Sequence, residues 1–367
     1  MIILLLGRLD DLYVVRSVEA SFLKQTDIFI SGEEGYHTYR IPAMVVSTEG
    51  TILVFCEGRK YSRADYGDID IVLKRSFDNG NTWQSMQIVA DDGENTIGNP
   101  SPVVDLHTGT IWLLFCKNNI QVYVTKSTDY GETWSIPVEL TDDVKREEWY
   151  WYATGPCHGI QLDNGKLVIP CDHQEGPRTP GKMHYSHIIY SDDHGSSWKL
   201  GGKIGPYMDE STIVQTYDGS LYLNMRNYTP PPNDHIRAYS HSKDEGITWS
   251  EANFDKTLVE PICQASIIRF TDKNQHDKNR ILFSNPASRG ERINMTVRLS
   301  YDECKTWSVS KSLYSGPSAY SDLAVTPDMN ICCVYERGER SPYEKITFAR
   351  FNIEWLTNNT DHISLKR

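Results

Sequence analysis

The sequence lacks the short motifs that mark several common functional classes. It has no CxxC pair, no HExxH segment and no GxxxxGK[ST] loop, so neither a typical zinc site nor a phosphate-binding loop is present. No apolar run approaches the roughly 20 residues that span a membrane. The net charge is −12, which disfavours binding to nucleic acid or to an anionic membrane surface. We therefore expect no nucleic-acid partner, no membrane span, no metal and no other cofactor.

The N-terminus also lacks a recognisable targeting signal. A short apolar run follows Met1, and Arg8, Asp10 and Asp11 come soon after it. This run is shorter than the apolar region of a signal peptide. The sequence as written therefore indicates a cytoplasmic protein, whereas a different native start would allow a secreted or periplasmic one. We expect residues 1–24 to form an extension of uncertain structure and residues 25–367 to form a single domain.

Cysteine and histidine are present but do not follow a metal-binding spacing. Six of them fall between positions 157 and 187, and the intervals between them do not repeat. This group consists of Cys157, His158, Cys171, His173, His184 and His187. Elsewhere, Cys332 and Cys333 are adjacent in an apolar run, which is typical of buried free thiols.

What the sequence does contain is an eight-residue segment that returns along the chain. The copies are SFDNGNTW at 76, STDYGETW at 127, SDDHGSSW at 191, SKDEGITW at 242 and SYDECKTW at 300. Their aspartates, at 78, 129, 193, 244 and 302, are separated by 51, 64, 51 and 58 residues. Intervals of this size indicate a repeated structural unit. Runs rich in β-branched and aromatic residues precede most copies, which predicts strands.

The residues of this octet are suited to a tight turn. Ser and Asp side chains form hydrogen bonds to nearby backbone amides, Gly adopts a positive φ, and Trp packs the turn onto the strands. Because turn chemistry accounts for each position, we interpret the aspartates as structural and not as catalytic or metal-binding. In the fifth copy, Cys304 stands where the others have glycine, which predicts a distorted turn.

The repeat interval also predicts the fold class. A unit of this length holds about four short strands, as in a propeller blade. The five marked units are completed by a last blade, shared between the C-terminal strands ICCVYERG and KITFARF and the N-terminal strand DIFIS. We therefore predict an all-β fold, a six-bladed β-propeller of four-stranded antiparallel blades.

Together with the segment YRIP at 39–42, the octets resemble the Asp-boxes of the exo-α-sialidases, or neuraminidases. The resemblance extends from about Ile28 to Trp355. It implies a glycoside hydrolase that removes terminal sialic acids with retention of configuration. Its expected partner is a sialylated glycan on a glycoprotein, a glycolipid or an oligosaccharide.

The same resemblance implies an arginine triad formed by Arg40, Arg226 and Arg292. Each of them lies at or near a strand end in a different repeat. Strand ends of a propeller converge on its centre, where three guanidinium groups repel one another unless an anion lies between them. A carboxylate fits this demand by charge and geometry. Arg59 resembles a fourth arginine near the substrate, and Glu336 resembles the acidic residue that steadies Arg40.

Three further residues match the catalytic positions of the family. Asp65, in a loop after Arg59, resembles the general acid/base, with Asp68 as the alternative. Tyr320 resembles the nucleophile, and Glu210 resembles the base that takes its proton. A tyrosine suits this reaction because sialic acid carries a carboxylate on its anomeric carbon, which would repel a carboxylate nucleophile.

Other segments match family loops that come near the substrate. Asn99 and Gln161 are expected to contact the ligand. Residues 149–152, which read WYWY, fit either a sugar-stacking rim or packing inside a blade. Residues 227–235 form a proline-rich loop that we expect at the edge of the site.

Two other functions remain open on the sequence. A non-catalytic glycan-binding propeller would keep the octets but lose the catalytic residues, all of which are present here. A sialidase variant with the same catalytic set would transfer sialic acid to another sugar, release an anhydro product or prefer a deaminated sialic acid.

Overall fold

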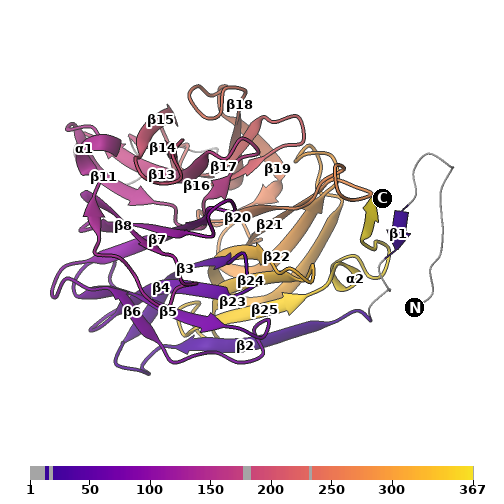
Figure 1. Ribbon diagram of the computed structural model, residues 1–367, viewed down its shortest axis with the longest axis horizontal. Helices are drawn as coiled ribbons and strands as arrows, with labels where there is room; N and C mark the ends of the chain where they lie inside the picture. The colour runs from indigo at the N-terminus through magenta and orange to yellow at the C-terminus, as the bar shows by residue number, and fades with distance from the viewer. Residues whose placement is uncertain (1–12, 16–19, 177–182, 231–233, 367) are drawn as a thin grey trace.

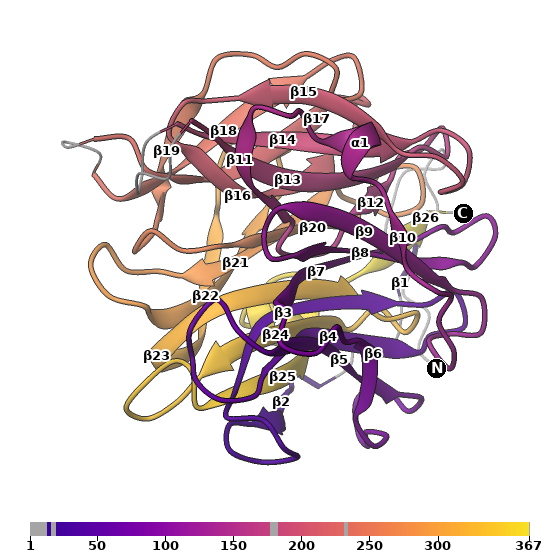
Figure 2. The same ribbon diagram turned by 90° about the vertical axis from the view of Figure 1, so that its left-hand side faces the viewer.

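The computed structural model describes residues 13–15, 20–176, 183–230 and 234–366. Within these ranges the two helices, α1 (Thr141–Val144) and α2 (Ile353–Leu356), have only four residues each. The strands form antiparallel sheets arranged around a common centre (Figure 1 and Figure 2). The fold is therefore an all-β propeller of mainly four-stranded blades. No helix in the described ranges is long and apolar enough to cross a membrane.

Three of the sheets have four strands, and their strands follow the order of the chain. The first consists of β3 (Thr38–Val46), β4 (Ile52–Arg59), β5 (Ile69–Ser76) and β6 (Gln87–Ala90). The second consists of β7 (Ile97–Val104), β8 (Ile111–Lys117), β9 (Gln121–Ser127) and β10 (Val138–Glu139). The third consists of β16 (Met208–Gln215), β17 (Leu221–Asn227), β18 (Ile236–Ser242) and β19 (Asn253–Val259).

A five-stranded sheet lies between the second and third of these in the chain. It consists of β11 (Trp149–Thr154), β12 (Ile160–Gln161), β13 (Leu167–Glu175), β14 (His184–Ser191) and β15 (Lys199–Ile204). Both β11 and the two-residue β12 pair with β13, so the position of the first blade strand is divided between two short segments. The loop between β11 and β12 is thereby free to turn toward the centre of the molecule.

The remaining blade strands form one seven-stranded sheet. It consists of β20 (Ser266–Thr271), β21 (Arg280–Pro286), β22 (Ile293–Ser300), β23 (Val309–Val325), β24 (Ile331–Arg337), β25 (Lys345–Phe351) and β2 (Leu23–Ile30). The first part of β23 pairs with β22 up to Pro317, and the part from Ser318 onward pairs with β24. The described strands thus form five large sheets, and the prediction of six separate blades is not met, because one continuous strand joins two groups of four.

The predicted sharing of the last blade between the two chain ends is confirmed. Strand β2 pairs with β25, which pairs with β24, so a segment before the first blade completes the last one. A smaller sheet joins β1 (Tyr13–Val15) to β26 (Ser364–Lys366). The rest of the predicted extension before residue 20 lies outside the described residues.

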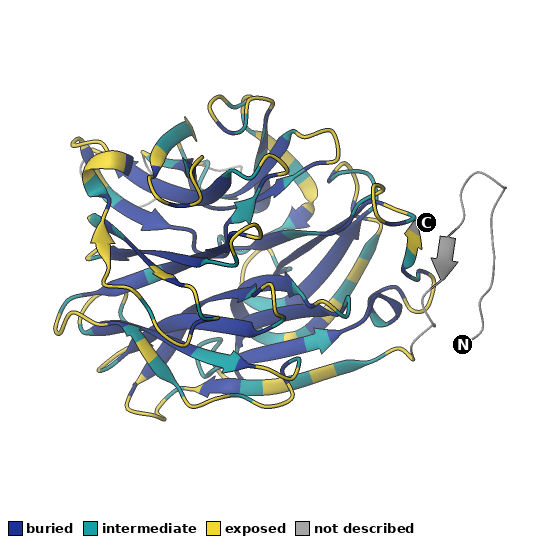
Figure 3. Ribbon diagram, viewed as in Figure 1, coloured by how far each residue is buried: buried dark blue, intermediate teal, exposed yellow. Residues whose placement is uncertain are grey.

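The centre of the propeller is held by a buried carboxylate, Asp322 of β23. Its Oδ2 accepts the amide N–H of Met44 in β3 at 2.8 Å and that of His158 at 3.1 Å. Its Oδ1 accepts the hydroxyl of Ser266 in β20 at 2.7 Å and lies 2.6 Å from Nδ1 of His158. One aspartate therefore ties together four chain segments. The first two strands of the blade that contains Met44, β3 and β4, are buried along almost their whole length (Figure 3).

Each octet forms the turn after the third strand of its blade, at 76–83, 127–134, 191–198, 242–249 and 300–307. In the first turn, Ser76 Oγ accepts the amide N–H of Gly80 at 2.8 Å, and Asp78 accepts both the amide and the hydroxyl of Thr82 at 2.8 Å. Gly80 has φ of 78°. In the fifth turn Cys304 adopts φ of 65° and donates the equivalent hydrogen bond at 3.0 Å. The prediction of a distorted fifth turn is therefore wrong, although the left-handed backbone there still favours glycine.

Candidate active site

A cavity of about 360 Å³ opens where the first strands of the blades begin. Its wall is built from the starts of β3, β7, β11 and β16 and from the ends of β4, β13 and β17. The octet turns follow the third strands, at the opposite ends of the sheets, so they do not contribute to it. Eight predicted site residues line the cavity: Arg40, Arg59, Asp65, Asn99, Glu210, Arg226, Arg292 and Tyr320.

The three predicted triad arginines meet around the ring of Tyr320. The guanidinium carbon of Arg40 lies 5.1 Å from the ring centroid, and that of Arg292 lies 5.4 Å from it. Arg226 approaches from the other side, where its Nη1 donates to the Tyr320 hydroxyl at 3.1 Å. Tyr343, which the sequence analysis missed, stacks on Arg40 at 4.2 Å and accepts a hydrogen bond from Arg292 at 3.0 Å. Residues from distant blades thus create one strongly cationic region.

The hydroxyl of Tyr320 is hydrogen-bonded to Glu210 at the start of β16. The other oxygen of Glu210 accepts from Arg226 Nη1 at 2.7 Å. Burial, and then the nearby Glu210 charge, raise the pKa of Tyr320 well above its ordinary value, while Arg226 and Arg292 act against that rise. The phenol therefore holds its proton in the ligand-free protein, next to a carboxylate that is positioned to accept it.

Glu336, at the end of β24, lies behind the arginines and is fully buried. Its Oε1 accepts from Arg40 Nε at 2.7 Å and from the amide of Ile41 at 2.9 Å, and its Oε2 accepts from the amide of Tyr320 at 3.1 Å. Ile41 has φ of 58°, a conformation that is costly for a β-branched residue, and the register of β3 shifts at this point. The contact with Glu336 therefore stabilises the strained YRIP backbone and orients Arg40.

Asp65 lies in the loop between β4 and β5, and its side chain is 77% exposed. Its Oδ1 accepts from Arg59 Nη1 at 2.7 Å and lies 3.5 Å from Arg40 Nη1. Burial acts to raise the pKa of Asp65, but Arg59 and Arg40 outweigh it and lower the pKa below its ordinary value. The alternative, Asp68, pairs with Lys60 at 2.8 Å and does not line the cavity. Only Asp65 is therefore placed to reach a ligand in the cavity.

Glu57, which was not predicted from the sequence, holds this side of the cavity together. Its Oε2 accepts from Arg59 Nε at 2.9 Å and Nη2 at 2.6 Å, and its Oε1 accepts from the amide of Asn99 at 2.9 Å. A Cβ on Gly98 would lie only 2.4 Å from that Oε1, so glycine is required there. Glu57 and Arg59 are two residues apart in β4 and therefore share a face of the strand, a signal that could have revealed the pair.

The opposite wall contains His184, Asp209 and Tyr228, none of which was predicted as a site residue. His184 Nδ1 lies 2.7 Å from Asp209 Oδ2, and the His184 ring stacks on Tyr228 with centroids 5.7 Å apart. Behind them lies Asp172, which is fully buried and has no hydrogen-bond partner for either oxygen among the described residues. Burial, and then the charges of Asp209 and Glu210, raise the pKa of Asp172 well above its ordinary value.

Some predicted contacts are placed elsewhere. Gln161 does not line the cavity, because its side chain lies in the turn after β7, where Nε2 donates to Asp105 at 2.8 Å and Oε1 accepts from the amide of Leu106 at 2.8 Å. The expectation that it contacts ligand is therefore not supported. The aromatic run is split: Trp151 lines the cavity, whereas Trp149 is buried in a core cluster. Tyr152 is buried in the same cluster, and Tyr150 is 62% exposed.

The cysteine and histidine group of residues 157–187 does not converge on one point within the described ranges. His184 alone of the six lines the cavity. His173 and His187 are buried behind it, where the ring of His173 stacks on Trp149. Of the predicted proline-rich edge loop, residues 231–233 lie outside the described residues.

Comparison with known proteins agrees with this arrangement. The BNR repeat-like domain family matches residues 50–333. The chain is 32% identical to an exo-alpha-sialidase of Aspergillus fumigatus, over 89% of this chain and 87% of that protein. It is 31% identical to a sialidase of Bacteroides fragilis over 83% of this chain, and spans 61% of that longer protein. The solved Hadza microbial sialidase Hz136 superposes with a TM-score of 0.81 at 29% identity, over 90% of this chain and 69% of that chain.

The chain belongs to the exo-α-sialidase family. It is accordingly a glycoside hydrolase, and the resemblance drawn from the sequence is confirmed at the level of the family.

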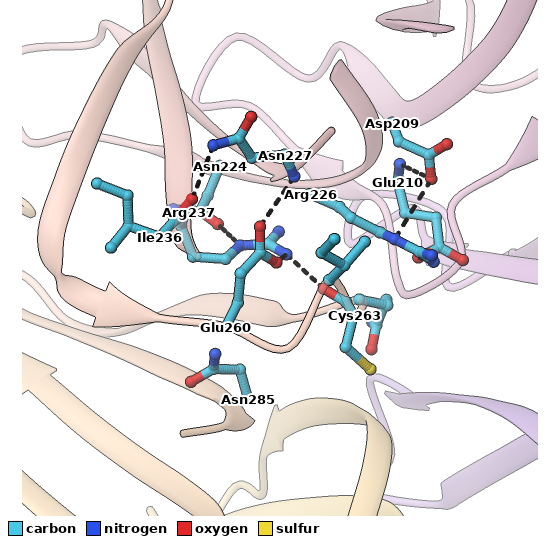
Figure 4. A network of polar contacts seen from close by, with 12 residues as sticks. Asp209, Glu210, Asn224, Arg226, Asn227, Ile236, Arg237, Glu260, Cys263 and Asn285 are labelled. Atoms are coloured by element: carbon cyan, nitrogen blue, oxygen red, sulfur yellow. Dashed lines mark hydrogen bonds and ion pairs between the residues drawn. The ribbon is translucent and has the colours of Figure 1, made fainter. Parts of the chain in front are cut away.

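A second buried ion pair supports the sialidase cavity from behind. Arg237 Nη1 in β18 lies 2.6 Å from Glu260 Oε2, and Glu260 Oε1 accepts the amide of Asn227 at 2.9 Å. Both charged side chains are fully buried. Figure 4 shows this pair beside Arg226 and Glu210. Because Asn227 follows Arg226 directly in β17, the pair fixes the end of the strand that carries one of the triad arginines.

Proposed function

We propose that this sialidase is a retaining exo-α-sialidase that removes terminal sialic acids from glycoconjugates through a tyrosine nucleophile. The observation that carries the proposal is the position of the Tyr320 hydroxyl. It lies between Glu210 and Arg226, in a cavity that Arg40 and Arg292 also line. One bound sugar can therefore reach a nucleophile, the base beside it and a group of arginines that binds its carboxylate.

The carboxylate of the substrate docks on Arg40, Arg226 and Arg292. Guanidinium groups match a carboxylate by charge and by the geometry of their N–H donors. Arg40 and Arg226 are paired with carboxylates, whereas Arg292 has no ion-pair partner among the described residues and is therefore available to a bound anion.

In the first step, Tyr320 transfers its phenolic proton to Glu210 and its oxygen attacks the anomeric carbon. The glycosidic C–O bond breaks through an oxocarbenium-like state, and the leaving oxygen takes a proton from Asp65. A tyrosine in this role is a recognised exception to the usual pair of glycosidase carboxylates. Arg226 and Arg292 favour the phenolate as it forms, which offsets the effect of burial on the Tyr320 pKa.

Asp65 must carry a proton to act as the acid, yet Arg59 and Arg40 hold it ionised in the ligand-free protein. The substrate carboxylate competes for Arg40, which weakens the hold on Asp65 and raises its proton affinity. Asp65 is exposed on a loop and can move, whereas Arg59 is buried and clamped by Glu57. In the second step, Asp65 takes a proton from water, the water attacks the anomeric carbon, and the bond from that carbon to Tyr320 breaks with net retention as the phenolate takes its proton back from Glu210.

We also propose that the seven-stranded sheet functions as two blades that meet at Pro317–Ser318, which makes six blades in all. The change of pairing partner of β23 at this point supports the division, because each half then has four strands, with β2 as the outer strand of the second half.

The test is hydrolysis of 4-methylumbelliferyl-α-sialic acid by the wild type and by Tyr320→Phe. We expect turnover by the wild type and a loss of about a thousandfold or more in the variant, with retained binding of a sialic-acid analogue. Tyr123→Phe is the matched control, because Tyr123 also donates to a glutamate, Glu139, at 3.2 Å but lies outside the cavity.

Product configuration is then read by proton NMR immediately after mixing. The α-anomer of the free sugar as first product supports retention, and the β-anomer contradicts it. A Tyr320→Phe variant with near-normal turnover contradicts the nucleophile assignment. A wild type that binds sialic acid without turnover of either the N-acetyl or the deaminated substrate favours the glycan-binding alternative.

A further inference from the structure

The third octet turn carries a histidine to the neighbouring blade. His194 is its fourth residue, and its Nδ1 lies 2.9 Å from Oδ2 of Asp105, which directly follows β7 in the second blade. His107 follows Asp105 by two residues, in the turn after β7. The potential ligand atoms of Asp105, His107 and His194 all lie within 4.8 Å of one another. Two imidazoles and a carboxylate from two blades therefore share one small space, far from the proposed catalytic residues in the chain and outside the cavity.

Asp105 is held in a fixed orientation by its neighbours. It is fully buried, and its Oδ1 accepts from the amide of His107 at 3.0 Å and from Gln161 Nε2 at 2.8 Å. Its Oδ2 accepts from the hydroxyl of Thr108 at 2.8 Å. The carboxylate is thus held in one orientation, as carboxylate ligands of metal ions usually are.

The two imidazole rings lie close enough together for one metal ion to reach both. Their centroids are 5.8 Å apart and their planes are 79° from parallel. Two imidazoles on a tetrahedral ion with metal–nitrogen bonds of about 2.0–2.1 Å have centroids roughly 5 Å apart. Gly165 leaves room for the His107 ring, since a Cβ there would lie 3.2 Å from His107 Cε1. Both histidines are exposed, so an ion can reach them from solvent.

Other octets show what an ordinary residue does at the fourth position. Asn79 donates to Asp328 at 3.1 Å, Glu245 pairs with Lys166 at 2.5 Å, and Glu303 accepts from the amide of Tyr217 at 2.8 Å. These residues, like His194, have φ between 58° and 61°. The fourth residue is therefore a tie to the preceding blade. A tie of this kind explains the contact between His194 and Asp105. It does not explain the presence of His107, whose ring completes a set of three metal-binding donors at this octet turn alone.

We propose that Asp105, His107 and His194 bind one divalent transition-metal ion, with Zn²⁺ as the best match, and with water as the fourth ligand. Nitrogen and oxygen donors in this ratio suit Zn²⁺, whereas Mg²⁺ and Ca²⁺ prefer oxygen ligands alone. The ion links the turn after β7 to the turn after β14. Its role is to stabilise the contact between two blades and not to take part in glycoside hydrolysis.

The experiment is isothermal titration of Zn²⁺ into the full chain after treatment with a chelator, at pH 7.5. We expect one equivalent bound by the wild type. His107→Gln and His194→Asn each weaken binding at least tenfold, since each removes one of three ligands. Asparagine is chosen for position 194 because Asn79 already occupies the equivalent left-handed position. Both positions are exposed, so these variants preserve the fold better than replacement of the buried Asp105.

Two controls accompany the titration. His362→Gln removes a histidine that also pairs with a carboxylate, Glu354 at 3.2 Å, without a second histidine beside it, and should leave Zn²⁺ binding unchanged. Mg²⁺ and Ca²⁺ should give no binding. At saturating Zn²⁺ the wild-type melting temperature should rise by roughly 3 °C, and that of His107→Gln should not. No Zn²⁺ binding by the wild type, or binding that both histidine variants retain, overturns the proposal.

Discussion

Carboxylates hold both the octet turns and the cavity, but their partners come from different distances along the chain. In the fourth octet, Asp244 accepts from the amide and the hydroxyl of Thr248, four residues away. In the cavity, Glu336 accepts from Arg40 and Ile41, almost 300 residues away. The octet aspartate therefore finds its hydrogen-bond donors within one turn. The cavity glutamate reaches Arg40 and Ile41 only when the first and last blades meet.

This difference decides what each carboxylate can do. Partial burial acts to raise the pKa of Asp129 and Asp193, but hydrogen bonds within their turns outweigh it and lower the pKa to about 2. These groups stay ionised and are fully occupied by local donors, so they build the scaffold. The carboxylates of the cavity contact arginines that a ligand can also contact. In the proposed reaction, their interactions change when substrate binds.

The largest effect is expected from Glu336→Gln, which removes the charge of a carboxylate whose partners are distant in the chain. The change leaves Arg40 without its buried counter-charge and weakens the support of Ile41 and Tyr320. We expect kcat/KM to fall about a hundredfold or more, and the free energy of unfolding to fall by about 3 kcal/mol. Steady-state kinetics and urea unfolding measure the two effects. Normal activity with normal stability would show that Arg40 does not depend on this contact.

A smaller effect is expected from breaking one local turn with Asp244→Ala. Loss of the hydrogen bonds from Thr248 and Ser242 should lower the free energy of unfolding by about 1 kcal/mol. Because the turn lies at the end of its blade opposite to the cavity, kcat and KM should stay within about twofold of the wild type. Urea unfolding and hydrolysis assays are run on the same preparation. A large loss of activity in a stable variant would contradict the separation of scaffold and site.

Acid should weaken the scaffold in a defined pH range. The pKa of Asp129, Asp193 and Asp244 is about 2 in the folded protein, below the value of about 3.9 in unfolded chains. Lowered pKa values stabilise the folded state above the unfolded pKa, and this contribution is lost as the pH falls from about 4 toward 2. Urea midpoints at pH 7, 4 and 2.5 should therefore decrease, and the decrease should be smaller in Asp193→Asn. An equal decrease in this variant would assign the acid sensitivity to other groups.

The smallest effect is expected for Asp172, whose carboxylate has neither a nearby nor a distant hydrogen-bond partner in the part of the chain that the structure describes. Burial raises the pKa of Asp172 well above its ordinary value and so favours the neutral acid, which asparagine resembles in charge and shape. We expect unfolding free energy within about 0.5 kcal/mol of the wild type and hydrolysis within about twofold. Asp209→Asn provides the contrast, since it removes the charge beside His184 and should cost more. A strong loss in Asp172→Asn would show that this carboxylate is ionised in the native protein.

The features that could be predicted from sequence are those that depend on nearby residues or on a whole motif. The octets predicted turns and strands because their Ser, Asp and Gly act within eight positions, and the pairing of the last blade with β2 is confirmed. Gln161 was misplaced because a family loop fixes the region but not which way one side chain points, and this one turns toward Asp105. The number of separate sheets was not predicted correctly, because no feature of the sequence indicates that β23 continues through Pro317 without a break.

The sequence by itself determined the repeat, the all-β class, the family and the arginines, aspartate, glutamates and tyrosine that line or support the cavity. Only the tertiary structure decided that Glu57 accepts the amide of Asn99, that Asp322 ties four segments at the centre, and that His107 meets His194. The physical reason is range. Turn chemistry acts between residues that are neighbours in the chain, whereas these contacts join strand ends and turns that come together only when the blades close around their centre.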